Sequence, residues 1–301
     1  MIDYNKKALV IVNPTAGKKS VQSNMFNIIN PLCQAGYMPT VVTTSASGDA
    51  TVYAHEMGGD YDIVVCCGGD GTLNETITGM MSSGNIKPIG YIPCGTTNDM
   101  AKSLGLPKTI KAAAEMIAEG NRGFHDVGRF GEGMYFSYIA SFGAFTKVSY
   151  TTPQATKNLL GHFAYVLEGA KELGKIRSYH VKFTFDDQVI EDDFIYASIT
   201  NTTSFAGLFS FPKNTVTLND GLFELLLIKK PSNLFQLERI VNGILTKNYD
   251  PQYVELIQTD KVRFVFEKPI AWTLDGEDGG KHTDVTLQCR RGAVSIYVPR
   301  E

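Results

Sequence analysis

The chain has 301 residues, 43% of them hydrophobic and 20% charged, so it is long enough for two ordinary domains and too apolar to be disordered. A net charge of −3 and the lack of any Lys/Arg cluster exclude nucleic acid as an expected partner. The apolar run before Asn13 and Pro14 is too short for a signal peptide or a membrane span, and we therefore expect a cytoplasmic protein. The five cysteines have neither disulfide-scaffold nor Cys-x-x-Cys spacing, so we expect small buried side chains.

Strand and helix patterns alternate over the first 125 residues. Buried strands are predicted at 8–12, 40–44, 63–67 and 89–92, and helices at 21–32, 50–57, 73–81, 98–104 and 110–118. This rhythm predicts an α/β domain over residues 1–130 with a mostly parallel sheet and helices on both faces. Ligands bind at the carboxyl ends of the strands in such sheets. Four loop residues fall there, namely Asn13, Thr44, Gly68 and Gly95.

The pattern changes after residue 129. Strands are predicted at 135–142, 181–185, 194–200, 222–228, 262–266, 271–274 and 293–298, and helices at 163–173 and 234–244. We expect a second domain over residues 131–301, built as a mainly antiparallel β-sandwich or barrel. No long linker is present, and we therefore expect the two domains to pack side by side with a cleft between them.

Two glycine-rich segments follow predicted strands and lead into predicted helices, GGDGTLN at 68–74 and PCGTTND at 93–99. Glycines let the backbone approach a phosphate closely, while amide N–H groups and the positive end of the helix dipole face the anion. Neither segment is a Walker A loop, and Gly-x-Gly-x-x-Gly is absent from the chain, which disfavours a P-loop or a Rossmann site. The segments predict a phosphate site of another kind.

Asp70 lies between glycines in a turn, where its carboxylate would repel a bound polyphosphate unless a cation intervened. Mg²⁺ resolves this conflict, since it takes one or two protein carboxylates together with phosphate oxygens and waters. Asp70 and Asp99 are therefore candidate partners of Mg²⁺. In the alternative interpretation, Asp70 stabilises only its own turn, and Asn98 and Asp99 are ordinary helix N-caps.

A third segment, NPTAG at 13–17, ends the first strand and offers further backbone donors. Together with GGDGTLNE at 68–75, PCGTTNDMAKSLGLP at 93–107, LNDG at 218–221 and LDGE at 274–277, it resembles the catalytic family of diacylglycerol kinases. The resemblance covers nearly the whole chain and includes a weaker match, HDVG at 125–128. The chain departs from the family pattern at Ala16, where a serine is usual.

The resemblance implies roles for particular residues. Nucleotide contacts fall on Asn13, Pro14, Thr15, Ala16, Gly17, Thr44, Gly68, Gly69, Asp70, Gly71, Thr72, Leu73, Asn74 and Thr96, with Asn98 and Asp99 beside them. Glu277 is implied as the acceptor of the lipid hydroxyl proton, and Asp275 supports its turn. A second, structural Mg²⁺ is implied at Asp220 with Thr217 and Leu222, although an Asn-Asp-Gly hairpin turn also explains Asp220.

The resemblance implies a lipid kinase that uses ATP and Mg²⁺ and transfers the γ-phosphoryl group to a lipid hydroxyl. Diacylglycerol is the favoured acceptor, with phosphatidic acid as the product. We expect transient contact with the inner face of the membrane, and Phe205, Phe209 and Phe211 either touch lipid there or pack in the core. An NAD kinase with the same glycine loop and a non-catalytic nucleotide- or lipid-binding regulator are the alternatives. The oligomeric state stays open, and a homodimer is among the options.

Overall fold

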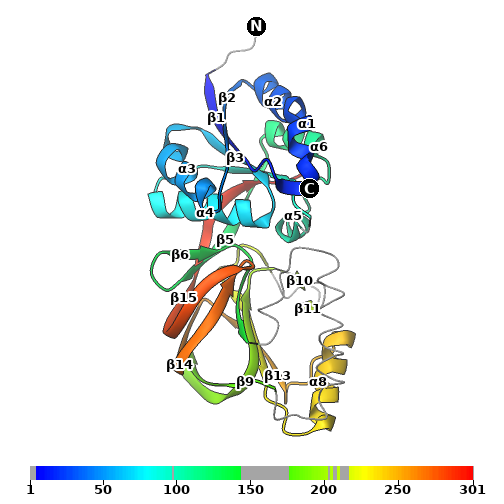
Figure 1. Cartoon of the computed structure of the whole chain (residues 1–301), viewed down its shortest axis with the longest axis vertical. Coiled ribbons are helices and arrows are strands. Elements are labelled where there is room, and N and C mark those ends of the chain that lie inside the picture. The colour runs from blue at the N-terminus through cyan, green and yellow to red at the C-terminus, as the bar shows by residue number, and fades with distance from the viewer. Residues whose placement is uncertain are drawn as a thin grey trace. The chain divides into compact units, whose positions relative to one another are not determined.

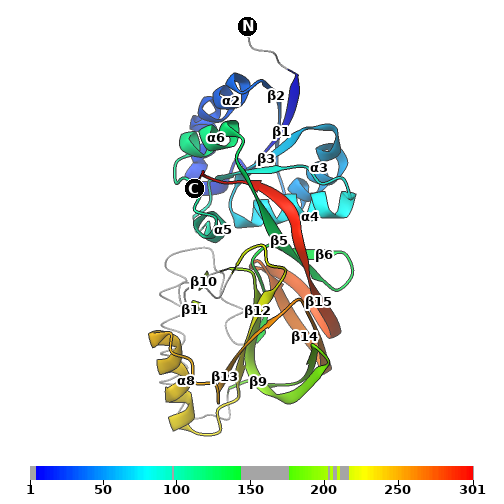
Figure 2. The ribbon, with the colours of Figure 1, turned by 180° about the vertical axis from the view of Figure 1, so that it is seen from behind.

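The computed structural model describes residues 5–96, 98–143, 176–202, 204–205, 209–210 and 217–300, with the backbone alone at 18–20, 204–205 and 209–210. The predicted helix at 163–173 lies outside these residues. The chain divides into two compact units (Figures 1 and 2). The first contains Met1–Val127, Gly133–Ser137 and Arg291–Glu301, and the second contains Gly128–Glu132 and Tyr138–Arg290.

A single boundary at residue 130 therefore differs from the observed division. It assigns residues 133–137 and 291–301 to the second domain, whereas their contacts place them in the first unit. The reason is strand β15 (Glu277–Tyr297), which begins in the second unit and ends in the first, where Ile296 pairs with Ile89 in parallel.

The first unit is built on a parallel sheet in the order β4-β3-β1-β2. Its strands are β1 (Lys6–Val12), β2 (Tyr37–Thr43), β3 (Ile63–Gly68) and β4 (Ile89–Pro93). Helices α3 and α4 lie on one side of this sheet and α2 and α6 on the other (Figures 1 and 2). The helical segments are η1 (Ala16–Lys19), α1 (Ser20–Ser23), α2 (Met25–Gln34), α3 (Asp49–Met57), η2 (Gly58–Asp60), α4 (Asp70–Ser83), α5 (Asp99–Ser103) and α6 (Ile110–Glu119).

Local sequence explains these elements. All residues of β3 are buried, and so are the last five of β1, as expected for central strands covered on both faces. Helix α6 begins after Thr109, whose hydroxyl accepts the N–H of Ala112, and it ends at Gly120 in the left-handed conformation.

The second unit is mainly antiparallel, as the sequence predicts. Strand β8 pairs with both β9 and β14, and β7 also pairs with both, so that these four strands close into a barrel-like ring. The order continues from β9 through β12 to β13. The strands of this part are β7 (Ile139–Gly143), β8 (Tyr179–Phe185), β9 (Gln188–Thr200), β12 (Phe223–Lys229), β13 (Val254–Thr259) and β14 (Lys261–Leu274). The remaining strands are β5 (Arg122–Phe130), β6 (Met134–Phe136) and a separate pair, β10 (Ser204–Phe205) with β11 (Phe209–Ser210).

Aromatic side chains form much of the core of the second unit. Trp272 is 1% exposed and packs edge-to-face on Phe142, with ring centroids 4.8 Å apart. Phe264 contacts the same two rings and stacks on Phe183. Edge-to-face and offset pairs of this kind stabilise a core beyond the area they bury.

Four strand predictions differ from the structure. The strand predicted at 135–142 is broken into β6 and β7 at Ser137 and Tyr138. The strands predicted at 262–266 and 271–274 are one strand, β14, with a register shift between Val265 and Ile270. Of β15 only the end is predicted, although buried Val285, Leu287 and Cys289 alternate with more exposed residues in its earlier part.

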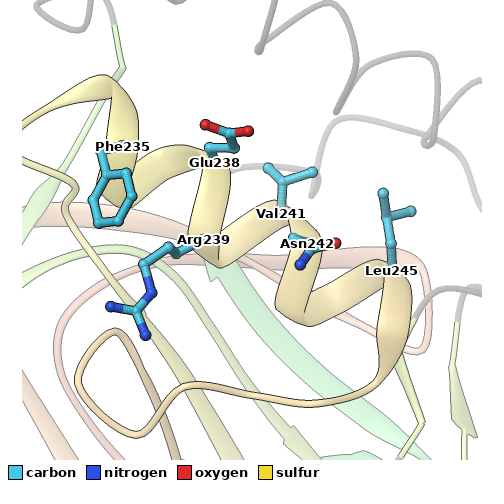
Figure 3. A pocket seen from close by; sticks show the side chains of 6 residues that line it. All are labelled: Phe235, Glu238, Arg239, Val241, Asn242 and Leu245. Carbon is cyan, nitrogen blue, oxygen red and sulfur yellow. The ribbon is translucent and has the colours of Figure 1, made fainter.

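Helix α8 (Leu234–Thr246) packs Leu237, Ile240, Val241 and Ile244 into a cluster with β9 and β12. The helix also borders a shallow pocket of about 400 Å³, to which Val241 contributes as well. Figure 3 shows the side chains that line it, Phe235, Glu238, Arg239, Val241, Asn242 and Leu245. No residue of the expected functional sites lies in this pocket. Among the described residues, no helix combines the length and apolar character needed to cross a membrane.

Replacing Gly79 in α4 with alanine is expected to lower the free energy of unfolding by about 1–3 kcal/mol, although alanine is the better helix former. An added methyl group would meet the carbonyl oxygen of Thr51 and lie 2.7 Å from the Cβ of Ala54 in α3. Urea unfolding measures the change. Gly123→Ala is the control, because its methyl group would first meet Val298 at 3.5 Å. Unchanged stability of G79A would show that α3 and α4 separate at little cost.

Candidate functional site

Four strand ends meet at the carboxyl edge of the parallel sheet. The N–H of Asn13 donates to the carbonyl of Cys67 at 2.9 Å, and that of Thr44 donates to Val12 at 2.9 Å. The N–H of Cys94 donates to Gly68 at 2.7 Å. The structure therefore brings together the loops that hold Asn13, Thr44, Gly68 and Gly95.

The two glycine-rich segments touch through their backbones. A Cβ at Gly95 would lie 2.6 Å from the Cα of Gly69, so any side chain at residue 95 would push the loops apart. A Cβ at Gly68 would lie 2.5 Å from the Thr72 side chain. The hydroxyl of Thr72 also accepts a hydrogen bond from Asn13 Nδ2 at 3.2 Å, which adds the first loop to the cluster.

Asp70 is the first residue of α4, but its carboxylate accepts hydrogen bonds from the backbone of another helix, α5. One oxygen accepts the N–H of Asp99 at 2.9 Å and the other that of Met100 at 3.1 Å, so Asp70 caps the N-terminus of α5. This differs from the expected turn between glycines. It also corrects the interpretation of Asn98 as a side-chain cap, because Asn98 has φ 48° and its Nδ2 donates to Gly95 at 2.8 Å.

Two opposing effects act on the Asp70 carboxyl. Burial raises its pKa, and the two N–H bonds from Asp99 and Met100 lower it without cancelling the rise. The negative charge of Asp99 adds to the rise. Asp99 itself forms an ion pair with Lys102 at 2.9 Å. An ionised Asp70 is therefore held by backbone dipoles in a site that favours an additional positive charge.

Glu75 has a parallel role that the motif reading missed. Its carboxylate accepts the N–H groups of Gly48 at 2.9 Å and Ala50 at 3.3 Å, at the start of α3. It also accepts the hydroxyl of Ser47 at 3.2 Å. Glu75 thus fixes the loop that follows Thr44. A local signal existed, since the glutamate directly follows the GGDGTLN segment, but its partners are distant in sequence.

The NPTAG segment is organised by Asn13. Its Oδ1 accepts the N–H of Thr15 at 3.0 Å and the Thr15 hydroxyl at 2.8 Å. Gly17 has φ 56°, which glycine adopts readily. Of the other expected nucleotide residues, Thr96 is exposed, while Leu73 is fully buried and donates its N–H to Gly69 within α4. Pro14, Ala16, Gly71 and Asn74 are half-buried, and the side chains of Lys18 and Lys19 lie outside the described residues.

The LDGE segment forms the tip of the β14–β15 hairpin. Leu274 pairs with Glu277, and both turn residues, Asp275 (φ 49°) and Gly276 (φ 90°), are left-handed, as in a type I′ turn. The Asp275 Oδ1 accepts the N–H groups of Tyr138 at 3.0 Å and Ile139 at 2.9 Å. The hairpin is therefore clamped at the break between β6 and β7. Glu277 is exposed at its tip.

The LNDG segment precedes β12 in the same unit. Asp220 Oδ1 accepts the N–H of Leu222 at 2.9 Å, which closes the turn, and Thr217 is exposed. Four residues on, Glu224 is 4% exposed, and its Oε2 has no hydrogen-bond partner among the described residues. Burial, with a smaller contribution from the charge of Asp220, raises the pKa of Glu224 to about 8.

The carboxylates fit a magnesium ion better than a closed metal cage. Among the described residues, no group of three His, Cys, Asp or Glu side chains could hold a metal ion. Mg²⁺ does not need such a group, because phosphate oxygens and waters usually complete its shell. Asp70 with Asp99 meets that requirement at the glycine loops. At the LNDG turn, the unpartnered oxygen of Glu224 beside the charge of Asp220 also suits a cation.

Comparisons with known proteins identify relatives of this chain. Residues 7–130 match the family model of the diacylglycerol kinase catalytic domain. A diacylglycerol kinase of Bacillus subtilis (strain 168) is 32% identical over 299 residues, covering 98% of this chain and 97% of the relative. A diacylglycerol kinase of Staphylococcus saprophyticus is 33% identical over 301 residues, covering 98% and 96%.

Solved structures share the fold over nearly the whole chain. One from Bacillus anthracis (strain Sterne) is 26% identical with a TM-score of 0.80, covering 97% of this chain and 95% of its own. A diacylglycerol kinase of the same strain is 24% identical with a TM-score of 0.75, covering 97% of each chain.

Fold and relatives together define a two-domain lipid kinase, an enzyme that transfers a phosphoryl group to an alcohol. The chain belongs to the diacylglycerol kinase family. Membership of this family implies the use of ATP. It also argues against the two alternatives that the motifs left open, an NAD kinase and a non-catalytic regulator.

Asp70→Asn is expected to lower the free energy of unfolding by about 1–3 kcal/mol, because the amide offers one oxygen where two N–H groups need acceptors. Hydrogen exchange of the amides in Asp99–Ser103 should accelerate locally, and urea unfolding should report the global change. Asp99→Asn removes only the exposed ion pair with Lys102 and should cost below about 1 kcal/mol. Equal protection of α5 in D70N and wild type would contradict the capping role.

Glu224→Gln is expected to stabilise the protein increasingly as pH rises. The folded-state pKa of about 8 lies above the ordinary 4.5, so protonated Glu224 supports the fold fully below pH 4.5. That contribution is lost as pH rises from 4.5 to about 8, whereas glutamine cannot ionise. Urea unfolding of both proteins in a chelating buffer, at pH values between the two pKa values of about 4.5 and about 8, measures the difference in their free energies of unfolding. A difference independent of pH would contradict the burial of this carboxyl.

Proposed function

We propose that the protein is an ATP-dependent diacylglycerol kinase that transfers the γ-phosphoryl group of ATP to the free hydroxyl of diacylglycerol, giving phosphatidic acid. The observation that carries this proposal is the cluster of loops joined by the Asp70 carboxylate, together with the exposed Glu277 on a clamped hairpin. The names of the bacterial relatives support diacylglycerol as the acceptor.

The first unit supplies the nucleotide site in this proposal. The start of α4, a helix of 14 residues, offers N–H groups and the positive end of its dipole to the phosphates. Close backbone contact between Gly69 and Gly95 leaves no side chain to obstruct an anion at that point. Asn13, Thr44, Thr96 and the NPTAG backbone complete the donors. The loss of the usual serine at Ala16 removes one hydroxyl and keeps the backbone N–H groups.

The second unit supplies the group that acts on the acceptor. In transfer, a bond forms between the lipid hydroxyl oxygen and the γ-phosphorus, and the bond from that phosphorus to the bridging oxygen of ADP breaks. Glu277 takes the hydroxyl proton, for which an exposed carboxylate is suited. Asp275 does not react; its two backbone bonds hold the turn in place.

Mg²⁺ is part of the proposal at both carboxylate sites. Asp70 and Asp99 would hold it near the nucleotide, where it supplies neutralisation of phosphate charge. Asp220, with Thr217 and Leu222, would hold a structural ion beside Glu224. We further propose transient contact with the inner face of the membrane, since the acceptor is dissolved there. The side chains of Phe205, Phe209 and Phe211, suggested for that contact, lie outside the described residues.

The test is to incubate purified protein with labelled ATP, Mg²⁺ and vesicles containing diacylglycerol, and to identify the labelled lipid by mass spectrometry. Glu277→Gln should fold and bind ATP normally while losing about 10²–10⁴-fold in kcat, the usual contribution of a general base. Glu267→Gln, an exposed carboxyl on the same hairpin, is the matched control and should retain full activity.

Two results would contradict the proposal. Near-normal turnover by E277Q would remove Glu277 from its role. If a total lipid extract is offered and the label from ATP appears on a lipid other than diacylglycerol, the proposed acceptor is wrong, while the protein is still a lipid kinase.

A further inference from the structure

His125, in the HDVG segment on β5, is fully buried in the first unit and has no part in the proposed chemistry. Its Nε2 lies 3.1 Å from the carbonyl oxygen of Ser137, and within the part of the chain that the structure describes its Nδ1 has no hydrogen-bond partner. Burial lowers the pKa of His125, so the ring is neutral at neutral pH. Because a carbonyl oxygen can only accept, Nε2 carries the proton and donates it to Ser137.

Ser137 stands at the break that follows β6, where the backbone leaves the strand pattern. Its carbonyl is held by His125, and its hydroxyl, in a side chain 2% exposed, donates to Asn74 Oδ1 at 3.2 Å. The adjacent residue of β5, Asp126, is anchored through its carboxylate to the N–H of Gly292 at 2.5 Å. The residues that contact or support Asn74 are thus held on β5, through His125 and Asp126, and after β6, through Ser137.

Asn74 follows Asp70 by four residues on α4, so the two side chains lie on the same face of the helix. With Oδ1 turned toward the Ser137 hydroxyl, the two N–H bonds of the amide point away from it. Among the described residues, none accepts a hydrogen bond from Asn74 Nδ2. Asn74 is half-buried, at the end of α4 that we assign to phosphate binding.

We propose that His125 and Ser137 are positioning residues, which hold the Asn74 amide with its N–H₂ group directed at an anionic oxygen of the bound nucleotide. The inference rests on the proposed function, because it assumes that ATP binds at the start of α4. Without the Ser137 hydroxyl the amide can rotate and present its oxygen, an acceptor that a phosphate repels. His125 acts one step further back, since it fixes the Ser137 backbone.

The experiment measures binding of a non-hydrolysable ATP analogue by calorimetry, together with KM for ATP and for diacylglycerol. Ser137→Ala and His125→Leu should weaken nucleotide binding and raise KM for ATP by about three- to tenfold, the factor that one neutral hydrogen bond is worth. KM for diacylglycerol should not change. His125→Gln, whose side-chain amide can donate to the same carbonyl, should restore binding to near the wild-type value.

Two controls separate positioning from general destabilisation. Ser83→Ala removes a hydroxyl that bonds to Met80 at 2.9 Å, near the other end of α4, and should leave KM for ATP unchanged. In an Asn74→Ala background, Ser137→Ala should have no further effect on nucleotide binding, since its influence passes through Asn74.

Additive effects of N74A and S137A would overturn the inference, and so would equal loss of binding in H125Q and H125L at equal thermal stability. A wild-type protein that binds ATP, together with unchanged binding by S137A, would overturn the inference and leave the proposed function standing. A wild-type protein that binds no ATP would overturn both.

Discussion

The carboxylate of Asp70 holds the carboxyl edge of the parallel sheet in the first unit together. Helix α5 has five residues, too few to be stable alone, and its own N-cap residue Asn98 makes no side-chain capping bond. The two bonds from Asp99 and Met100 to Asp70 therefore anchor both the helix and the PCGTTND segment before it. The backbone contact between Gly69 and Gly95 depends on the same junction, because it requires the two segments to stay in register.

Three carboxylate or amide side chains in the first turns of α4 each contact a different part of the unit. Asp70 fixes α5, Asn74 meets the segment after β6, and Glu75 fixes the loop before α3. GGDGTLNE is thus a structural junction, besides being the segment proposed to bind phosphate. A rigid surround of this kind suits phosphoryl transfer, in which the protein contributes mainly by positioning charges.

Much of this could be predicted from sequence, because buried strand runs and glycine turns are local signals. The four parallel strands, the barrel-like second unit and the Asp-Gly turn before Glu277 belong to that group. The capping of α5 by Asp70 could not, since the partners are 29 residues apart and Asn98 stood where a local cap is expected. The break at Ser137 depends on Asp275, which lies 137 residues from Tyr138. Most of β15 was not predicted, although its burial alternates over residues 285–289.

Strand β15 also affects the order in which the two units can be completed during synthesis. Its final residues pair with β4 in the first unit, yet the ribosome makes them only after the whole second unit. In chain order the second unit is an insertion within the first, so the parallel sheet lacks this strand throughout most of synthesis. The first unit, although its sequence begins the chain, therefore receives the last strand of its sheet only after the second unit has been made.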